Sequence, residues 1–158
     1  MKLYIKQRIF SWGDKFSVYD EFGNEKYYVE GEVFTFGKKL HIMDTSYNEV
    51  AFIHQKLLSF LPTYYLSRDG RDIAQIVKEF TFFKHEYRVD GLGWRVLGDF
   101  LSHEFVIYNG ERFAAQVFKE WFSWGDAYAI DIDPMADEVN ALAVALVIDA
   151  VISDQRDY

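Results

Sequence analysis

The stretch that decides the fold is 133–152, DPMADEVNALAVALVIDAVI, near the end of a 158-residue chain. Residues 141–148 include no polar side chain, and a single acid, Asp149, interrupts the apolar run that follows. Helix-forming residues dominate, Pro134 suits a first helical position, and Asp133 is expected to cap the helix. A helix that is apolar on every face must be buried on every face, either in lipid or inside protein.

The length of this segment argues against lipid. Its apolar part would be ~18 Å long at ~1.5 Å per residue, whereas the hydrocarbon layer of a bilayer is about 30 Å thick. A transmembrane helix is therefore not expected. We expect the rest of the chain to enclose the helix.

The residues before this segment predict about twelve strands in six hairpins. Apolar and polar residues alternate as they do in half-buried strands. A Ser or Thr followed by an aromatic residue recurs before short turns, most clearly in FSWGD, which occurs at 10–14 and again at 122–126. Glycine-rich polar clusters such as 21–24 and 108–110 provide the turns between hairpins.

An antiparallel sheet of this size is expected to close rather than leave free edges. Twelve strands ~4.8 Å apart and tilted by ~40° give a barrel roughly 24 Å across. A helix with its side chains needs ~10–12 Å, which leaves space for one layer of barrel side chains. The predicted fold is mainly β: a closed antiparallel barrel with the hydrophobic C-terminal helix through its centre, as a single domain over residues 1–158.

The composition restricts the possible partners. The formal net charge is −8, which opposes non-specific attraction to nucleic acid or to an anionic membrane, although a local basic patch could still exist. The chain has no cysteine, so disulfides and thiolate metal sites are excluded. The N-terminus lacks the continuous apolar stretch of a signal peptide, and we expect a cytoplasmic protein. No pattern in the sequence calls for a cofactor.

Basic residues form the one candidate ligand site. Lys38 and Lys39 share a predicted turn, and Lys84 and Arg88 lie in and after another. A lipid headgroup or a phosphate could bind such a patch. Ordinary solvated turns are the alternative, because acids such as Glu86 lie in the equivalent turns.

Three acids also require an explanation. Asp131 and Asp133 lie two apart on a strand, so they could share a cation or act as an acid/base pair. Alternatively, Asp133 caps the helix while Asp131 stays solvated. A buried Asp149 needs a partner or a raised pKa. It could be a calcium ligand at the mouth of the barrel, but we expect it near the barrel exit, bonded to backbone amides, an arginine or water.

Aromatic residues occupy the predicted turns at Trp12, Phe36, Phe60, Phe83 and Trp124. Clustered at one end of the barrel, they could contact a membrane or a protein partner. The preferred expectation is that they fold over the mouth of the barrel and plug the core. The four histidines show no metal-ligand spacing, and no nucleophile or phosphate-binding motif is present, so we expect no catalysis.

Four stretches together resemble the LURP-one-related proteins, bacterial and plant members of the tubby-like superfamily. They are YVEGEVFTFGKKLHIMD (28–44), NEVAFIHQKLLSFLPTYYL (48–66), GLGWRVLGDFLSHEFVIY (91–108) and KEWFSWGDAYAIDI (119–132). The resemblance implies a twelve-stranded barrel threaded by a C-terminal helix. Tubby domains bind phosphoinositides through basic surface residues, and phospholipid scramblases, similar in fold, are membrane-associated. No tubby contact residue matches a position here.

The resemblance therefore implies a non-catalytic module that binds at a membrane surface, to a lipid headgroup, or to a protein. The alternative is a structural or regulatory scaffold that recruits a protein partner and has no lipid role.

Overall fold

The structure is a computed structural model that describes residues 1–6, 15–32, 36–80, 85–99, 102–122 and 125–156. These residues form twelve strands and one helix. The strands are β1 (Lys2–Ile5), β2 (Lys15–Tyr19), β3 (Glu25–Glu32), β4 (Lys39–Asp44), β5 (Glu49–Gln55), β6 (Thr63–Arg68), β7 (Arg71–Phe80), β8 (His85–Asp90), β9 (Trp94–Asp99), β10 (Glu104–Asn109), β11 (Arg112–Phe122) and β12 (Gly125–Ile132). The helix is α1 (Glu138–Arg156).

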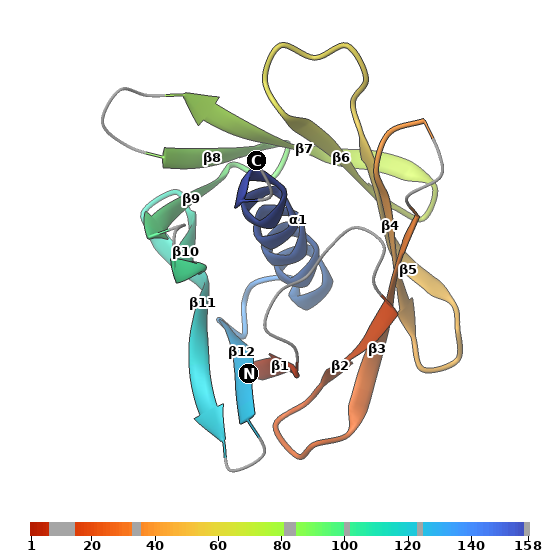
Figure 1. The fold of residues 1–158 in the computed structure, drawn as a ribbon, viewed down its shortest axis with the longest axis vertical. Coiled ribbons are helices and arrows are strands. Elements are labelled where there is room, and N and C mark those ends of the chain that lie inside the picture. The colour runs from red at the N-terminus through yellow and green to blue at the C-terminus, as the bar shows by residue number, and fades with distance from the viewer. Residues whose placement is uncertain (7–14, 33–35, 81–84, 100–101, 123–124, 157–158) are drawn as a thin grey trace.

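The strands form one closed antiparallel barrel. Each strand pairs with its neighbours in sequence, and β1 pairs with β12 to close the ring. Figure 1 shows this ring around α1. The prediction of six hairpins in a closed barrel is confirmed, and closure removes the free edges that would otherwise invite aggregation.

Consecutive strands alternate in direction, so the turns alternate between the two ends of the barrel. We call the end where α1 begins the entry end; it carries the β2–β3, β4–β5 and β6–β7 turns. We call the end where α1 finishes the exit end; it carries the β3–β4 and β5–β6 connections. This division matters because the hairpin turns of the entry end are acidic, whereas the β3–β4 and β5–β6 connections of the exit end carry lysine and no acid.

The helix fills the lumen of the barrel. Every residue from Asn140 to Ile152 is more than nine-tenths buried. These side chains form one hydrophobic cluster with the inward-facing residues of the strands, such as Leu3, Ile53 and Ile107. Burying an aliphatic side chain is worth about 1.5–3 kcal/mol, so α1 alone supplies on the order of 10 kcal/mol before entropy is subtracted. Among the described residues, no helix is long and apolar enough to cross a bilayer.

The start of α1 differs from the sequence prediction. Asp137, not Asp133, is the N-cap: its carboxylate accepts the backbone N–H of Asn140 at 2.8 Å. The carboxylate of Asp133 instead accepts the N–H of Met135 at 2.8 Å. The prediction that Asp133 caps the helix is therefore wrong, because residues 134–136 form a turn that carries the chain from the wall into the lumen.

Side chains from the wall hold the first turn of the helix in place. The hydroxyl of Tyr27 donates to the carboxylate of Glu138 at 2.6 Å, and Nζ of Lys26 lies 2.8 Å from the same carboxylate. Burial, together with the bond to Glu138, raises the pKa of Tyr27. Arg68 donates to Asp137 at 2.9 Å and to the side-chain oxygen of Asn140 at 2.7 Å. The entry end is thus fastened to the helix by polar contacts.

Candidate functional site

Two connections at the exit end carry large apolar side chains that face solvent. In the β3–β4 turn, Phe36 is 94% exposed. In the β5–β6 connection, Leu58 and Phe60 are fully exposed and Leu57 is half exposed. Apolar side chains that gather on one exposed surface are typical of sites that bind a membrane or a protein partner.

The two connections touch one another. A Cβ atom placed on Gly37 would lie 3.0 Å from Cδ2 of Leu57 and 3.5 Å from Cβ of Gln55. The backbone N–H of Gln55 also donates to the carbonyl of Lys38 at 2.9 Å. Figure 1 shows the two connections next to each other at the upper right of the barrel. Their exposed residues therefore belong to one continuous surface.

Lysines lie among these apolar residues. Lys38 and Lys39 follow Phe36, and exposed Lys56 precedes Leu57. The stretches 33–43 and 50–67 contain no acid, although the chain as a whole carries a net charge of −8. We call this set the exit-end surface; it comprises Phe36, Lys38, Lys39, Lys56, Leu57, Leu58 and Phe60.

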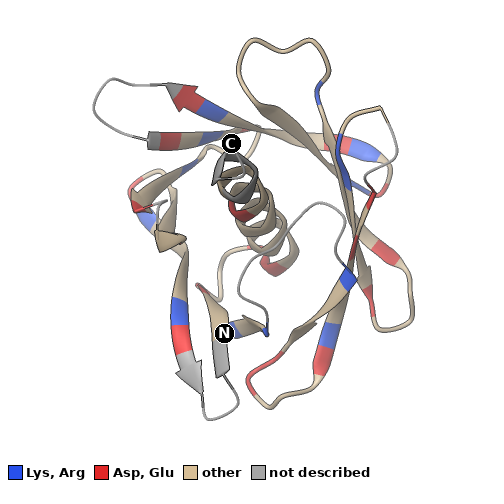
Figure 2. Ribbon diagram, viewed as in Figure 1, with Lys and Arg blue, Asp and Glu red and all other residues tan. Residues whose placement is uncertain are grey.

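The entry end also exposes apolar side chains, among them Phe22 and Met135, but its charge is the opposite. Each hairpin turn there contains an acidic residue: Asp20 and Glu21, Asp44, Asp69, Asp90 and Glu111. The β5–β6 connection, residues 56–62, contains Lys56 and no acid, and Figure 2 accordingly shows no red segment in it. The exit-end surface is therefore a local exception to the acidic balance of the molecule.

The structure does not assemble the predicted basic patch as a whole. Lys84 lies outside the described residues. Arg88 lies on β8, four strands around the barrel from Lys39 on β4. Its guanidinium is an ion-pair partner of Asp90, at 2.7 Å, and of Glu79, and both hydrogen bonds raise the pKa of Arg88. Arg88 is thus neutralised locally and is not part of the exit-end surface.

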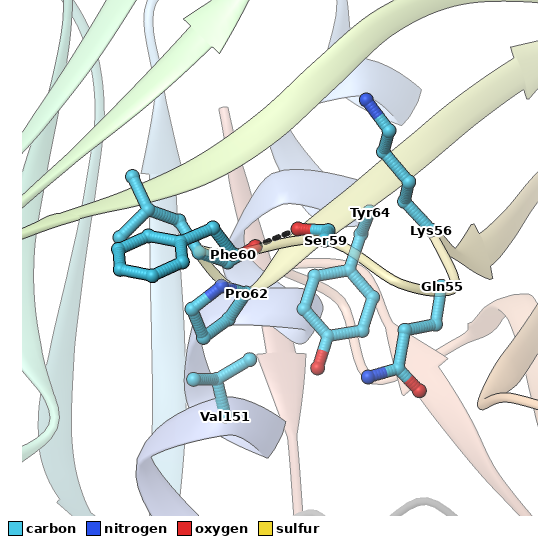
Figure 3. A pocket seen from close by; sticks show the side chains of 8 residues that line it. Gln55, Lys56, Ser59, Phe60, Pro62, Tyr64 and Val151 are labelled. Atoms are coloured by element: carbon cyan, nitrogen blue, oxygen red, sulfur yellow. Dashed lines mark hydrogen bonds between the residues drawn. The ribbon is translucent and has the colours of Figure 1, made fainter.

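A pocket opens beside the exit-end surface (Figure 3). Its volume is about 300 Å³, and it lies between the β5–β6 connection and the C-terminal part of α1. The lining residues are Gln55, Lys56, Ser59, Phe60, Leu61, Pro62, Tyr64 and Val151. Tyr64 is almost fully buried, and burial raises its pKa to about 12. The pocket was not predicted, because it depends on how the β5–β6 connection packs against a helix ninety residues later in the chain.

The preferred expectation for the turn aromatics is wrong where it can be assessed. Phe36 and Phe60 face solvent and do not fold over the core. The C-terminal part of α1 already occupies the lumen at this end, so the core does not need Phe36 and Phe60 to close it. The other three aromatic residues, Trp12, Phe83 and Trp124, lie outside the described residues.

Asp149 is buried in the lumen, and its partner is a histidine. The Nδ1–H of His103 donates to the carboxylate of Asp149. His103 is 1% exposed, and its ring also lies 6.0 Å from the ring of Tyr128. The other ring nitrogen, Nε2, has no hydrogen-bond partner among the described residues. The sequence indicated that Asp149 needs a partner, but it did not indicate His103.

The other two acids have separate partners. Asp131 lies 3.8 Å from the N-terminal ammonium, and Asp133 lies 3.5 Å from the guanidinium of Arg112. Within the part of the chain that the structure describes, His, Asp and Glu side chains form no group of three that could hold a metal ion.

A second hollow of about 310 Å³ lies on the outer face of β5 and β6. It brings together Ser67, Asp72 and His54, the residue types of a hydrolase triad. The carboxylate of Asp72 accepts from Ser67 and contacts Nε2 of His54 at 3.2 Å. In a working triad the histidine lies between the acid and the serine. Here the acid lies between them, so the serine has no base.

Comparison with known proteins identifies the family. The profile of the LURP-one-related family matches residues 1–149. This chain belongs to the LURP-one-related family. A relative, the uncharacterized protein YxjI of Bacillus subtilis (strain 168), is 36% identical over 157 residues, which cover 99% of this chain and 97% of that protein.

The fold of this LURP-one-related protein also occurs in a plant. The X-ray structure of a protein from Arabidopsis thaliana matches with a TM-score of 0.67 and covers 95% of this chain and 90% of that one. At 20% identity the likeness concerns the fold alone. The family resemblance and the fold it implies are confirmed.

Proposed function

We propose that this LURP-one-related protein is a non-catalytic binding domain that attaches peripherally to anionic membranes through its exit-end surface. The observation that carries the proposal is the exposure of Phe36, Leu58 and Phe60 in two touching turns. Apolar side chains interspersed with lysines are typical of segments that lie in a membrane interface.

The charge distribution supports one orientation. Each lysine near an anionic surface contributes about 1 kcal/mol, so the three lysines contribute about 3 kcal/mol. The apolar side chains must supply the remainder, which makes attachment reversible and sensitive to salt. The acidic turns of the entry end would be repelled by the same surface, so the exit end faces the lipid.

A binding role also fits the rest of the molecule. Because α1 fills the lumen, a partner must bind at an end or on the outside of the barrel. The arrangement of Ser67, Asp72 and His54 does not activate the serine. A cytoplasmic location suits a chain without cysteine, and the cytoplasmic leaflet supplies the anionic lipid.

Vesicle co-sedimentation tests the proposal. The protein is expected to sediment with phosphatidylcholine vesicles that contain phosphatidylserine, more strongly at low salt, and weakly with phosphatidylcholine alone. The double variant Phe36→Ser, Leu58→Ser is expected to lower the partition coefficient tenfold or more. A tenfold decrease corresponds to a loss of about 1.4 kcal/mol in the free energy of binding to the vesicle. Each apolar side chain is worth up to about 1.5–3 kcal/mol when fully buried.

A matched control comes from the entry end. Phe22 is 87% exposed and Met135 is 77% exposed. Phe22→Ser, Met135→Ser should leave vesicle binding unchanged. Equal losses in the two double variants would contradict the assignment of the surface. Absence of binding at low salt with every lipid composition would favour the alternative, in which the same apolar residues recruit a protein partner.

A further inference from the structure

The pocket beside the exit-end surface combines an apolar wall with a basic rim. Carbon atoms of Phe60, Leu61, Pro62 and Val151 and the ring of Tyr64 form most of it. Lys56, at the rim, is exposed. Figure 3 shows the side chain of Lys56 extending away from the apolar residues. A ligand that matches this lining is apolar along its length and negatively charged at one end.

The polar groups inside the pocket are largely engaged by the protein. Ser59 donates its hydroxyl to the carbonyl of Leu61. The side-chain oxygen of Gln55 accepts the backbone N–H of Lys38 at 3.1 Å. A sugar or a nucleotide needs several convergent polar groups for recognition. This lining suits a hydrocarbon chain better.

Two lysines adjoin the pocket through the backbone. The backbone of Lys38 bonds Gln55, and the backbone N–H of Lys78 donates to the carbonyl of Pro62 at 3.1 Å. Lys78 alternates along β7 with Ala74 and Ile76 of the core and is 6% exposed. Burial lowers the pKa of both lysines, so an anion nearby would favour their charged forms.

The size of the pocket matches a single chain. A volume of about 300 Å³ holds about ten groups the size of a water molecule, at ~30 Å³ each, and a methylene group is of similar size. Phe60 both lines the pocket and faces solvent at the exit-end surface. A chain leaving a bilayer in contact with this surface would therefore reach the pocket along apolar side chains.

We infer that this pocket binds one acyl chain of an anionic lipid, with the charged head at Lys56 and the chain along Phe60, Leu61 and Val151. The inference rests on the proposed function for the source of the lipid, but binding of a free fatty acid does not depend on vesicles. The acyl-chain site also predicts a stoichiometry of one lipid per protein, which attachment to a membrane surface does not require.

Titration calorimetry with decanoate, kept below its micellar concentration and without vesicles, tests the inference. The wild-type protein is expected to bind decanoate 1:1 and to bind decanol at least fivefold more weakly. Lys56→Glu is expected to weaken decanoate binding at least fivefold. Lys119 is also exposed but lies on β11, away from the pocket, and Lys119→Glu is expected to leave binding unchanged. Ser59→Trp, which fills the pocket, is expected to abolish binding.

Several results would overturn the inference. They are no decanoate binding by a folded wild-type protein, equal affinity for decanol and decanoate, or unchanged affinity in a folded Ser59→Trp variant. Vesicle binding without decanoate binding would contradict the acyl-chain site and would be consistent with the proposed function. Decanoate binding without vesicle binding would contradict the proposed function and would support the acyl-chain site.

Discussion

At the scale of single residues, the buried pair of Asp149 and His103 is the principal polar feature of the core. The sequence indicated that an acid in an apolar helix needs a partner, but the partner is forty-six residues away in the connection before β10. Which wall residue faces a given helix residue depends on the rotation of α1 in the lumen and on the strand register. Neither can be derived from residue patterns along the chain.

Removing Asp149 should destabilise the fold strongly. Asp149→Ala leaves His103 buried with neither ring nitrogen paired to the described residues, and breaking a buried pair costs about 3–5 kcal/mol. Urea unfolding measures the loss. Asp131→Ala is the control, because its partner is an exposed ammonium and such pairs are worth about 0–1 kcal/mol. If Asp149→Ala lowers the free energy of unfolding as little as Asp131→Ala is expected to, the buried pair has no stabilising role.

The buried tyrosines should make the protein sensitive to alkali. Burial raises the pKa of Tyr64 to about 12, whereas an unfolded tyrosine titrates near about 10. Between these values the folded state retains a proton that the unfolded state has lost, so stability is complete below about pH 10 and falls as the pH rises. The two-unit difference corresponds to about 3 kcal/mol.

Unfolding by urea at a series of pH values from about 9 to 12 checks this dependence. Tyr64→Phe should show a shallower decline than the wild-type protein. Tyr27 and Tyr87, whose pKa values burial also raises, should account for the decline that remains. Identical pH profiles of the wild-type and Tyr64→Phe proteins would contradict the assignment of Tyr64.

At the scale of elements, the start of α1 is set by one cap and its neighbours. In the sequence, Pro134 directly follows Asp133 and suits a first helical position, so Asp133 was the expected cap. The structure shows that the chain needs the turn at 134–136 to leave the wall before the helix can begin. The position of a cap therefore follows from the path of the chain as well as from residue type.

Asp137→Ala should lower the free energy of unfolding by about 1 kcal/mol, the usual value of an N-cap. Asp137→Asn should retain most of the stability, because asparagine caps about as well as aspartate. Thermal unfolding of the two variants makes the comparison. A wild-type melting temperature for Asp137→Ala would contradict the assignment of the cap.

At the scale of the whole molecule, the closed barrel and the helix inside it could be predicted from the sequence for a simple physical reason. A segment apolar on all faces needs a container, and six hairpins supply a barrel of the right diameter. The exit-end surface was only partly predicted. Phe36, Phe60, Lys38 and Lys39 were identified as candidates, but whether turn side chains fold inward depends on whether the helix already fills that end.

The pocket and the exclusion of Arg88 depend on three-dimensional packing. Arg88 looks like Lys38 in the sequence, yet its strand neighbours place Glu79 and Asp90 against it. The pocket arises where the β5–β6 connection meets Val151. Charge and apolar composition predict which residues are available for a site, and only the strand order shows which of them lie together.

Native-state hydrogen exchange of α1 tests the central claim that the barrel encloses this helix. Amides within 141–152 have no route to solvent unless the barrel opens, so they should exchange with the free energy of global unfolding and with its full dependence on urea. Pepsin digestion and mass spectrometry of the labelled protein give this value for the peptide. Exchange of these amides well below the global free energy, while the strands stay protected, would show that the helix leaves the barrel and would contradict the account.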